Sequence, residues 1–126
     1  MTDEISNPAF PPGRSEVTVT TETVRGAVVV SVSDVVDAAT APEVGSALDA
    51  VFDGAPPAVV VDLNAVTFLA SAGMTVLVQA RERAGTDIGF AVVAATAPTR
   101  RPLTLLGLDS ELSLCSSVDE ALGRLS

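Results

Sequence analysis

A hydroxyl group lies at the most informative point of the sequence, in the segment Val66–Met74 (VTFLASAGM). Ser71 stands where an apolar, strand-like run gives way to a helical run. Its neighbours are too small to shield it: Ala70, Ala72 and Gly73. Three kinds of chemistry compete for such a hydroxyl. Ser71 caps the helix by accepting a backbone hydrogen bond, or acts as a nucleophile on a sharp turn, or accepts a phosphate that the helix dipole favours.

The composition argues against the nucleophile. The chain of 126 residues has no His, and each of its seven basic residues is Arg, so no base is present to activate a serine. The absence of Lys also excludes a Schiff base and a P-loop, and the single Cys115 cannot form an intramolecular disulfide or a zinc cage. We therefore expect a protein that is not an enzyme, with no cofactor and no metal. An enzymatic alternative survives only if the carboxylates bind a metal or a nucleotide.

The net charge narrows the class of partner. Sixteen acidic residues give a formal net charge of -9. This charge disfavours direct binding to nucleic acid or to an anionic membrane, and it favours a basic protein partner. The N-terminus is acidic, unlike a secretory signal, and the apolar runs are far shorter than the roughly twenty residues of a membrane-spanning helix. We expect a cytoplasmic protein without membrane insertion, whose single thiol stays reduced.

The elements that must position Ser71 follow from hydrophobic periodicity and from the Gly and Pro residues. Residues 1–16, interrupted by Pro and Gly, are predicted to be a flexible N-terminal tail, and residues 17–126 a single domain. The predicted strands are Val17–Val24, Ala27–Val32, Ala58–Leu63, Val66–Leu69, Phe90–Ala94 and Leu112–Cys115. The predicted helices run from Thr40 to Gly54, from Ala70 to Ala84, from Pro98 to Leu106 and from Ser117 onwards.

Two of the predicted helices begin with the spacing of a capping box. Thr40 precedes Glu43 by three residues, and Ser117 precedes Glu120 by three. In each pair the hydroxyl is expected to accept the N–H of the acidic residue, whose carboxylate reaches back to the start of the helix.

The order of these elements indicates the α/β class. A hairpin followed by alternating helices and strands predicts a mixed, mostly parallel sheet of about five strands with about four helices. Functional loops in such sheets lie at the carboxyl ends of the strands. That rule selects Asp37–Thr40, Leu69–Gly73 and Ala94–Arg100.

The sequence resembles the STAS domain family, and within it the stand-alone bacterial anti-sigma factor antagonists. The resemblance covers residues 17–125 and rests on the order and spacing of several segments: Val28–Val32, Val36–Pro42 (VDAATAP), Val59–Leu63 (VVVDL), Val66–Met74, Leu105–Leu108 (LLGL) and Ser117–Leu122 (SVDEAL). It implies that the protein binds an anti-sigma factor with a kinase-like fold and so frees a sigma factor. It also implies a contact face made of Asp37, Thr40, Leu69, Ala70, Ser71, Ala72, Gly73 and Met74.

The sequence departs from the family at the position of its switch. The family's turn usually reads Leu-Asp-Ser-Ser/Thr-Gly-Leu, with the phosphate acceptor directly before Gly. Ala72 occupies that position here, Ala70 replaces the acid, and Ser71 lies one place earlier, rotated by about 100° around a helix. Before the preceding turn, the usual Gly-Glu is replaced by Asp34-Val35, while Asp37 is retained.

Several alternatives remain open at this point. Ser71 is an alternative acceptor, or the protein binds its partner without phosphate control, or regulation comes from elsewhere, for example from Cys115. The alternative function is a STAS scaffold subunit of a transporter or of a stress-signalling assembly. Such a subunit needs no kinase cycle, so it would need no phosphate acceptor at Ala72. We expect a monomer or weak dimer, a structural role for Asp62, an inert core thiol at Cys115, and a solvated pair at Arg100-Arg101.

Overall fold

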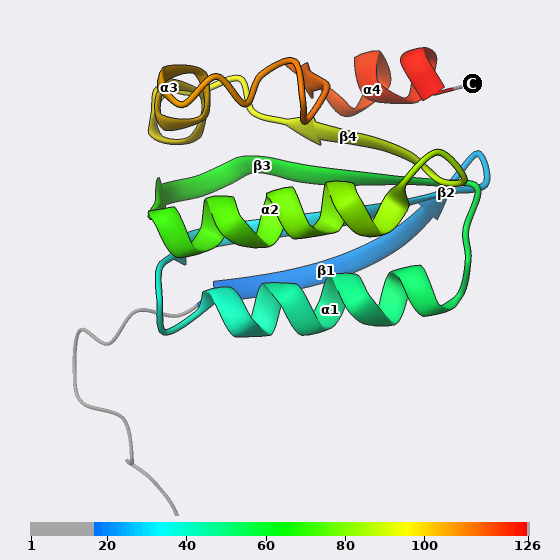
Figure 1. Cartoon of the computed structure of the whole chain (residues 1–126), viewed down its shortest axis with the longest axis horizontal. Coiled ribbons are helices and arrows are strands. Elements are labelled where there is room, and N and C mark those ends of the chain that lie inside the picture. Colours follow the sequence, from blue (N-terminus) through cyan, green and yellow to red (C-terminus); the bar gives the residue numbers. More distant parts are fainter. Residues whose placement is uncertain (1–16, 126) are drawn as a thin grey trace, which may run out of the picture.

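The structure is a computed structural model that describes residues 17–125. The predicted flexible tail, residues 1–16, lies outside the described residues. In chain order the elements are β1 (Val17–Val24), β2 (Ala27–Val36), α1 (Ala41–Asp53), β3 (Ala58–Leu69), α2 (Ser71–Ala84), β4 (Gly89–Val93), α3 (Ala97–Leu105), β5 (Leu114–Cys115) and α4 (Val118–Leu125) (Figure 1).

The strands form one sheet in the order β1-β2-β3-β4-β5. Strands β1 and β2 make the predicted antiparallel hairpin, and β2, β3, β4 and β5 are paired in parallel. Helices α1 and α2 lie side by side against one face, and α4 covers the other (Figure 1). Helix α3 packs at the carboxyl end of β3. The predicted fold class is therefore confirmed.

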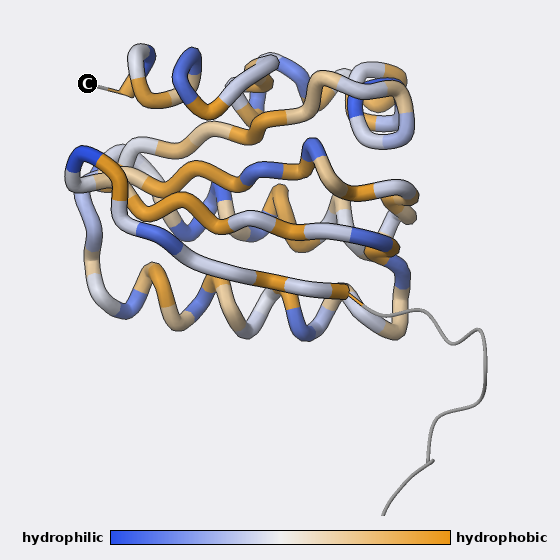
Figure 2. Tube along the Cα trace, turned by 180° about the vertical axis from the view of Figure 1, so that it is seen from behind, coloured by the Kyte–Doolittle hydropathy of each residue, from blue (hydrophilic) through white to orange (hydrophobic). Residues whose placement is uncertain are grey.

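The side chains on the two faces of the central strands belong to two separate apolar clusters. Val59 and Val61 of β3 pack toward α1 and α2, whereas Val60 packs toward α4. All three are completely buried, which explains why this strand is continuously apolar rather than alternating. The hydropathy colouring in Figure 2 shows the same concentration of apolar residues along the central strands.

Two strands are longer than the sequence pattern predicted. Strand β2 runs on to Val36 instead of ending at Val32, and β3 continues through Asn64 and Ala65 as one strand of 12 residues. The pairing of β2 with β3 shifts register between Ser31 and Ser33 and again between Asp34 and Val35. These irregularities let the ladder continue past polar residues that otherwise resemble a break.

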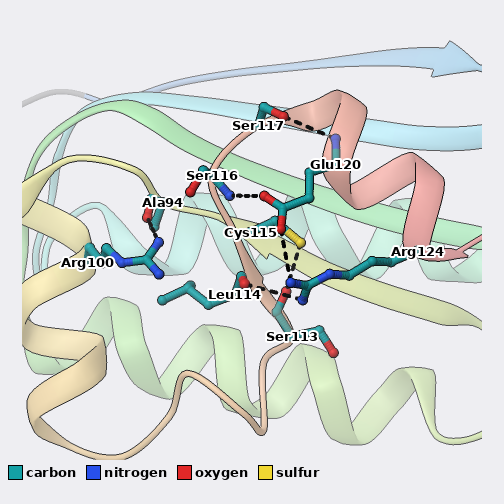
Figure 3. Close-up of polar contacts among 9 residues, drawn as sticks. All are labelled: Ala94, Arg100, Ser113, Leu114, Cys115, Ser116, Ser117, Glu120 and Arg124. Carbon is teal, nitrogen blue, oxygen red and sulfur yellow. Dashed lines mark hydrogen bonds and ion pairs between the residues drawn. The ribbon is translucent and has the colours of Figure 1, made fainter.

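The capping predictions had different outcomes. Ser117 Oγ accepts the N–H of Glu120 at 3.0 Å as expected, and Glu120 Oε1 accepts the N–H of Ser116 at 2.8 Å (Figure 3). The predicted box of Thr40 and Glu43 is wrong, because the Thr40 side chain makes no capping hydrogen bond to α1. Its hydroxyl is engaged in the loop that precedes the helix.

Candidate functional site

The turn between β3 and α2 is fixed to the end of the neighbouring strand. The N–H of Ala70 donates to the carbonyl of Val36 at 2.9 Å. This bond holds Ala70 in an extended conformation (φ -86°, ψ 171°), so Ala70 is the N-cap residue of α2 and Ser71 is its first helical residue. The prediction that Ser71 caps the helix is therefore wrong, because a residue that already has helical geometry cannot direct its hydroxyl to the N–H groups one turn ahead.

Ser71 is exposed at the start of α2. Its hydroxyl makes no hydrogen bond to another described residue, and Thr75 Oγ1 donates only to its backbone carbonyl, at 3.1 Å. The first N–H groups of a helix have no acceptor within the helix. The site therefore combines a free hydroxyl with the positive end of a helix dipole.

Gly73 lets α2 approach the sheet closely. A Cβ atom on Gly73 would lie 2.7 Å from Val36 Cγ1 and 2.7 Å from Leu69 Cδ1, closer than real Cβ contacts allow. The first turn of α2 thus packs directly on the ends of β2 and β3, and the position of Ser71 depends on this packing.

The neighbouring loop is held by its own side chains. Thr40 Oγ1 accepts the N–H of Asp37 at 2.9 Å and donates to the carbonyl of Val35 at 2.8 Å. Asp37 Oδ1 accepts the N–H groups of Ala39 and Thr40 at 3.0 and 3.1 Å. Asp37 and Thr40 therefore build the loop that enters α1 and place it beside the Ser71 turn.

Burial divides the eight residues of the predicted contact face into two groups. Four are buried and position the others: Thr40, Leu69, Gly73 and Met74. Four remain accessible: Asp37, Ala70, Ser71 and Ala72. Ala72 is partly buried against the core, whereas Ser71 faces solvent. The contact role of the accessible residues stays a prediction.

Asn64 of β3 lies next to the carboxyl ends of β4 and β5, and the sequence analysis did not single it out. Its Oδ1 accepts the N–H of Ala95 at 2.8 Å, and its Nδ2 donates to the carbonyl of Ser116 at 3.3 Å. Asn64 therefore joins β3 to the segments that follow β4 and β5. A polar residue inside an apolar strand was the only available signal. Asp62 is structural, as expected, because its Oδ1 accepts the N–H of Asn64 at 3.0 Å.

Cys115 is buried at the end of β5, as expected for a core thiol. Its Sγ donates to the carbonyl of Ser113 at 3.3 Å (Figure 3). Burial raises the pKa of the thiol; the charges of Arg124 and Arg100 lower this pKa and Glu120 raises it, by smaller amounts. The net rise keeps the sulfur protonated and unreactive.

Within residues 17–125, no group of three His, Cys, Asp or Glu side chains is placed to hold a metal ion. No helix in that same range has the length and apolar character needed to cross a membrane.

The chain matches a known protein family over most of its length. The family model of the STAS domain matches residues 18–121. The chain belongs to the STAS domain family. The match runs from the second residue of β1 to the middle of α4.

Individual relatives are similar over most of their length. The anti-sigma-F factor antagonist RsfB of Mycobacterium tuberculosis is 39% identical over 106 residues, which make up 84% of this STAS chain and 87% of RsfB. An anti-sigma factor antagonist from Mycobacterium paratuberculosis, known from a crystal structure, is 43% identical with a TM-score of 0.85 and covers 87% of this chain and 94% of its own. A putative antagonist from Thermotoga maritima, 17% identical over 85% of this chain and 93% of its own, shares the fold with a TM-score of 0.78.

Proposed function

We propose that this STAS protein is an anti-sigma factor antagonist: it binds an anti-sigma factor with a kinase-like fold and so frees a sigma factor for transcription. The similarity to RsfB, 39% identity over 87% of that protein, carries the proposal. The mycobacterial structure at 43% identity supports the same function. Both relatives favour an antagonist over a scaffold subunit of a transporter or stress-signalling assembly.

The proposed contact face consists of Asp37, Ala70, Ser71 and Ala72. Asp37 lies in the loop after β2, and the other three lie at the start of α2, which the bond from Ala70 to Val36 fixes to the end of β2 at the carboxyl edge of the sheet. Small side chains at the turn leave the backbone of α2 open to close approach by a partner. The face performs no chemistry of its own, so binding depends on its shape and on the charge of Asp37.

Ser71 is the proposed site at which phosphate would break the complex. Its hydroxyl is exposed and free of hydrogen bonds to described residues, and the N-terminus of α2 favours an anion there. A phosphate adds about -1.5 to -2 charge, which a docked interface beside Asp37 does not accommodate. Ala72, at the family's usual acceptor position, has no hydroxyl.

Calorimetry with the anti-sigma-F factor of the source organism tests the contact face. Ser71→Glu places a negative charge in the proposed interface and is expected to weaken binding by about a hundredfold, the range of a disrupted interface centre. Thr86→Glu is the matched control, since Thr86 is exposed in the turn after the opposite end of α2. Equal affinities of the two variants would contradict the proposed face, and no binding by the unmodified chain would contradict the function.

A kinase assay tests the acceptor separately. The anti-sigma factor with Mg-ATP should phosphorylate the unmodified chain and leave Ser71→Ala unmodified, as read by mass spectrometry. Phosphate on Ser71→Ala at the normal level would place the acceptor elsewhere. Unmodified protein in both samples, together with tight binding, would indicate control without phosphate.

Four properties accompany the proposed function. The protein acts in the cytoplasm as a monomer or weak dimer, binds no nucleic acid directly, and is not itself an enzyme. Calorimetry of the isolated protein with Mg-ATP or Mg-GTP should show no heat of binding and no turnover. Hydrolysis of either nucleotide would contradict the last property.

A further inference from the structure

The outer side of α3 is an apolar surface that the proposed function does not use. Leu105 is 77% exposed and Leu106, which follows the helix, is 60% exposed. Helix α3 packs on β3, and Phe68 near the carboxyl end of that strand is 54% exposed. We call Phe68, Arg101, Leu105 and Leu106 the α3 surface. Exposed apolar residues of this size gathered at one end of a domain are typical of interaction sites.

The α3 surface is hollowed along the helix. An open cavity of about 470 Å³ is lined by residues spaced three or four apart on α3 and by one residue that precedes the helix: Ala95, Ala97, Arg100, Arg101, Thr104 and Leu105. Because one helix supplies nearly all of the lining, the cavity has no opposing wall. A small molecule needs walls on most of its surface, so this hollow fits a macromolecular partner that brings the second wall itself.

The charge of the α3 surface is opposite to that of the rest of the chain. All sixteen acidic residues lie outside the range 88–108, which contains Arg100 and Arg101. Figure 2 shows strongly hydrophilic residues beside strongly hydrophobic ones on α3. In an acidic protein, a region without acids that carries two Arg residues attracts negative charge locally.

The two arginines differ in how far they are already engaged. One guanidinium nitrogen of Arg100 donates to the carbonyl of Ala94 at 2.9 Å (Figure 3). Arg100 also lines the cavity. Arg101 makes no hydrogen bond or ion pair to another described residue and is exposed. Arg83, by contrast, is paired with Asp49 and Asp53. Arg101 is therefore free to pair with an external carboxylate.

We propose that the α3 surface binds an acidic peptide segment of a second protein, one that carries apolar side chains among its carboxylates. The apolar side chains cover Phe68, Leu105 and Leu106, and the carboxylates pair with Arg101 and with the guanidinium nitrogens of Arg100 that do not bond Ala94. This partner differs in charge from the basic partner that the net charge of -9 favours for the Ser71 turn. The proposal therefore does not rest on the function proposed for that turn.

The test is a titration of the ¹⁵N-labelled full chain with two synthetic peptides, followed by NMR. One peptide carries Leu at helical spacing with Glu at the remaining positions, and the other replaces every Glu with Lys. The Glu peptide should shift the amide resonances of residues 95–108 and Phe68, with an affinity that falls as salt rises. The Lys peptide should leave them unchanged.

Variants of the α3 surface make the test specific. Arg101→Glu should weaken binding of the Glu peptide by about tenfold, because it replaces an attraction with a repulsion. Leu105→Ser should weaken it by a similar factor. Arg25→Glu is the matched control: Arg25 is exposed in the hairpin turn at the other end of the sheet and should change little.

Four results would overturn the proposal. The first is the absence of shifts at millimolar Glu peptide, and the second is equal binding of the Lys peptide. The third is movement of the same resonances with protein concentration alone, which would assign the surface to a second copy of the chain. The fourth is movement of these resonances in the free protein on Asp3→Asn with Glu4→Gln, which would assign it to the chain's own N-terminal residues.

Discussion

At the residue scale, three polar or reactive side chains have roles that depend on their surroundings more than on their type. The hydroxyl of Thr40 is buried and builds a loop, whereas that of Ser71 is exposed and free. The Cys115 thiol is buried and protonated. The sequence showed these residues but not which hydroxyl would be engaged, because that depends on the extended conformation imposed on Ala70 by Val36.

Thr40→Val should lower the free energy of unfolding by about 1–3 kcal/mol. The substitution keeps the shape of the side chain but leaves the N–H of Asp37 without its acceptor and removes the donor to Val35, and unpaired buried groups carry this cost. Urea denaturation measures the change. Thr20→Val on the exposed side of β1 is the control and should stay within about 0.5 kcal/mol of the original stability; an equal loss in both variants would contradict the role assigned to Thr40.

Cys115 should react slowly with iodoacetamide in the folded protein. Burial raises the pKa of its thiol, so little thiolate is present near neutral pH, and the rate should be at least about tenfold lower than in urea. The rate should climb as the pH rises through the raised pKa. Since the folded pKa lies above the unfolded one, the stability that this protonated thiol contributes is full below the unfolded pKa and falls at higher pH. Equal alkylation rates in folded and unfolded protein would disprove the burial.

At the scale of elements, the close approach of α2 to β2 and β3 places the candidate site. Hydrophobic periodicity, Gly and Pro predicted both the helix and its neighbouring strands closely. The register of β2 against β3 could not be predicted from the sequence. Asn64 and Ala65 resemble a loop in the sequence, and only the irregular pairing of the two strands shows that they continue β3. The hydrogen bonds from Asn64 to Ala95 and Ser116 could not be predicted from the sequence either, since they join residues far apart in the chain.

Gly73→Ala should destabilise the protein by about 1–3 kcal/mol, although Ala is the better helix former, because the new methyl group overlaps Val36 and Leu69. Gly45→Ala is the matched control in α1: a Cβ there meets Val76 at an ordinary 3.8 Å, so the substitution should stabilise by up to about 1 kcal/mol. Thermal or urea denaturation of the two variants gives the comparison. Stabilisation by Gly73→Ala would contradict the tight packing at the turn.

At the scale of the whole molecule, charge is distributed unevenly over a compact scaffold. The net charge of -9 coexists with an acid-free range at residues 88–108. The ion pairs formed by Arg83 and Arg124 are exposed, so they add little to stability. The composition predicted an acidic binding protein. The acid-free range can be read from the sequence, but its position at the carboxyl end of β3 depends on how α3 packs.

The acidic surface should accelerate encounter with a basic anti-sigma factor. The association rate constant, measured by stopped flow, should fall by roughly tenfold or more between low and high salt, while dissociation changes less. The reason is that salt screens long-range attraction more than contacts made in the complex. An association rate that is independent of salt would exclude electrostatic steering.

Sigma-dependent transcription in vitro tests the central claim most directly. RNA polymerase, its sigma factor and the anti-sigma factor are mixed, and transcript is measured with and without this STAS protein. The account predicts that the unmodified chain and Thr86→Glu restore transcription that the anti-sigma factor has silenced, whereas Ser71→Glu does not. Failure of the unmodified chain to restore transcript, or full restoration by Ser71→Glu, would contradict it.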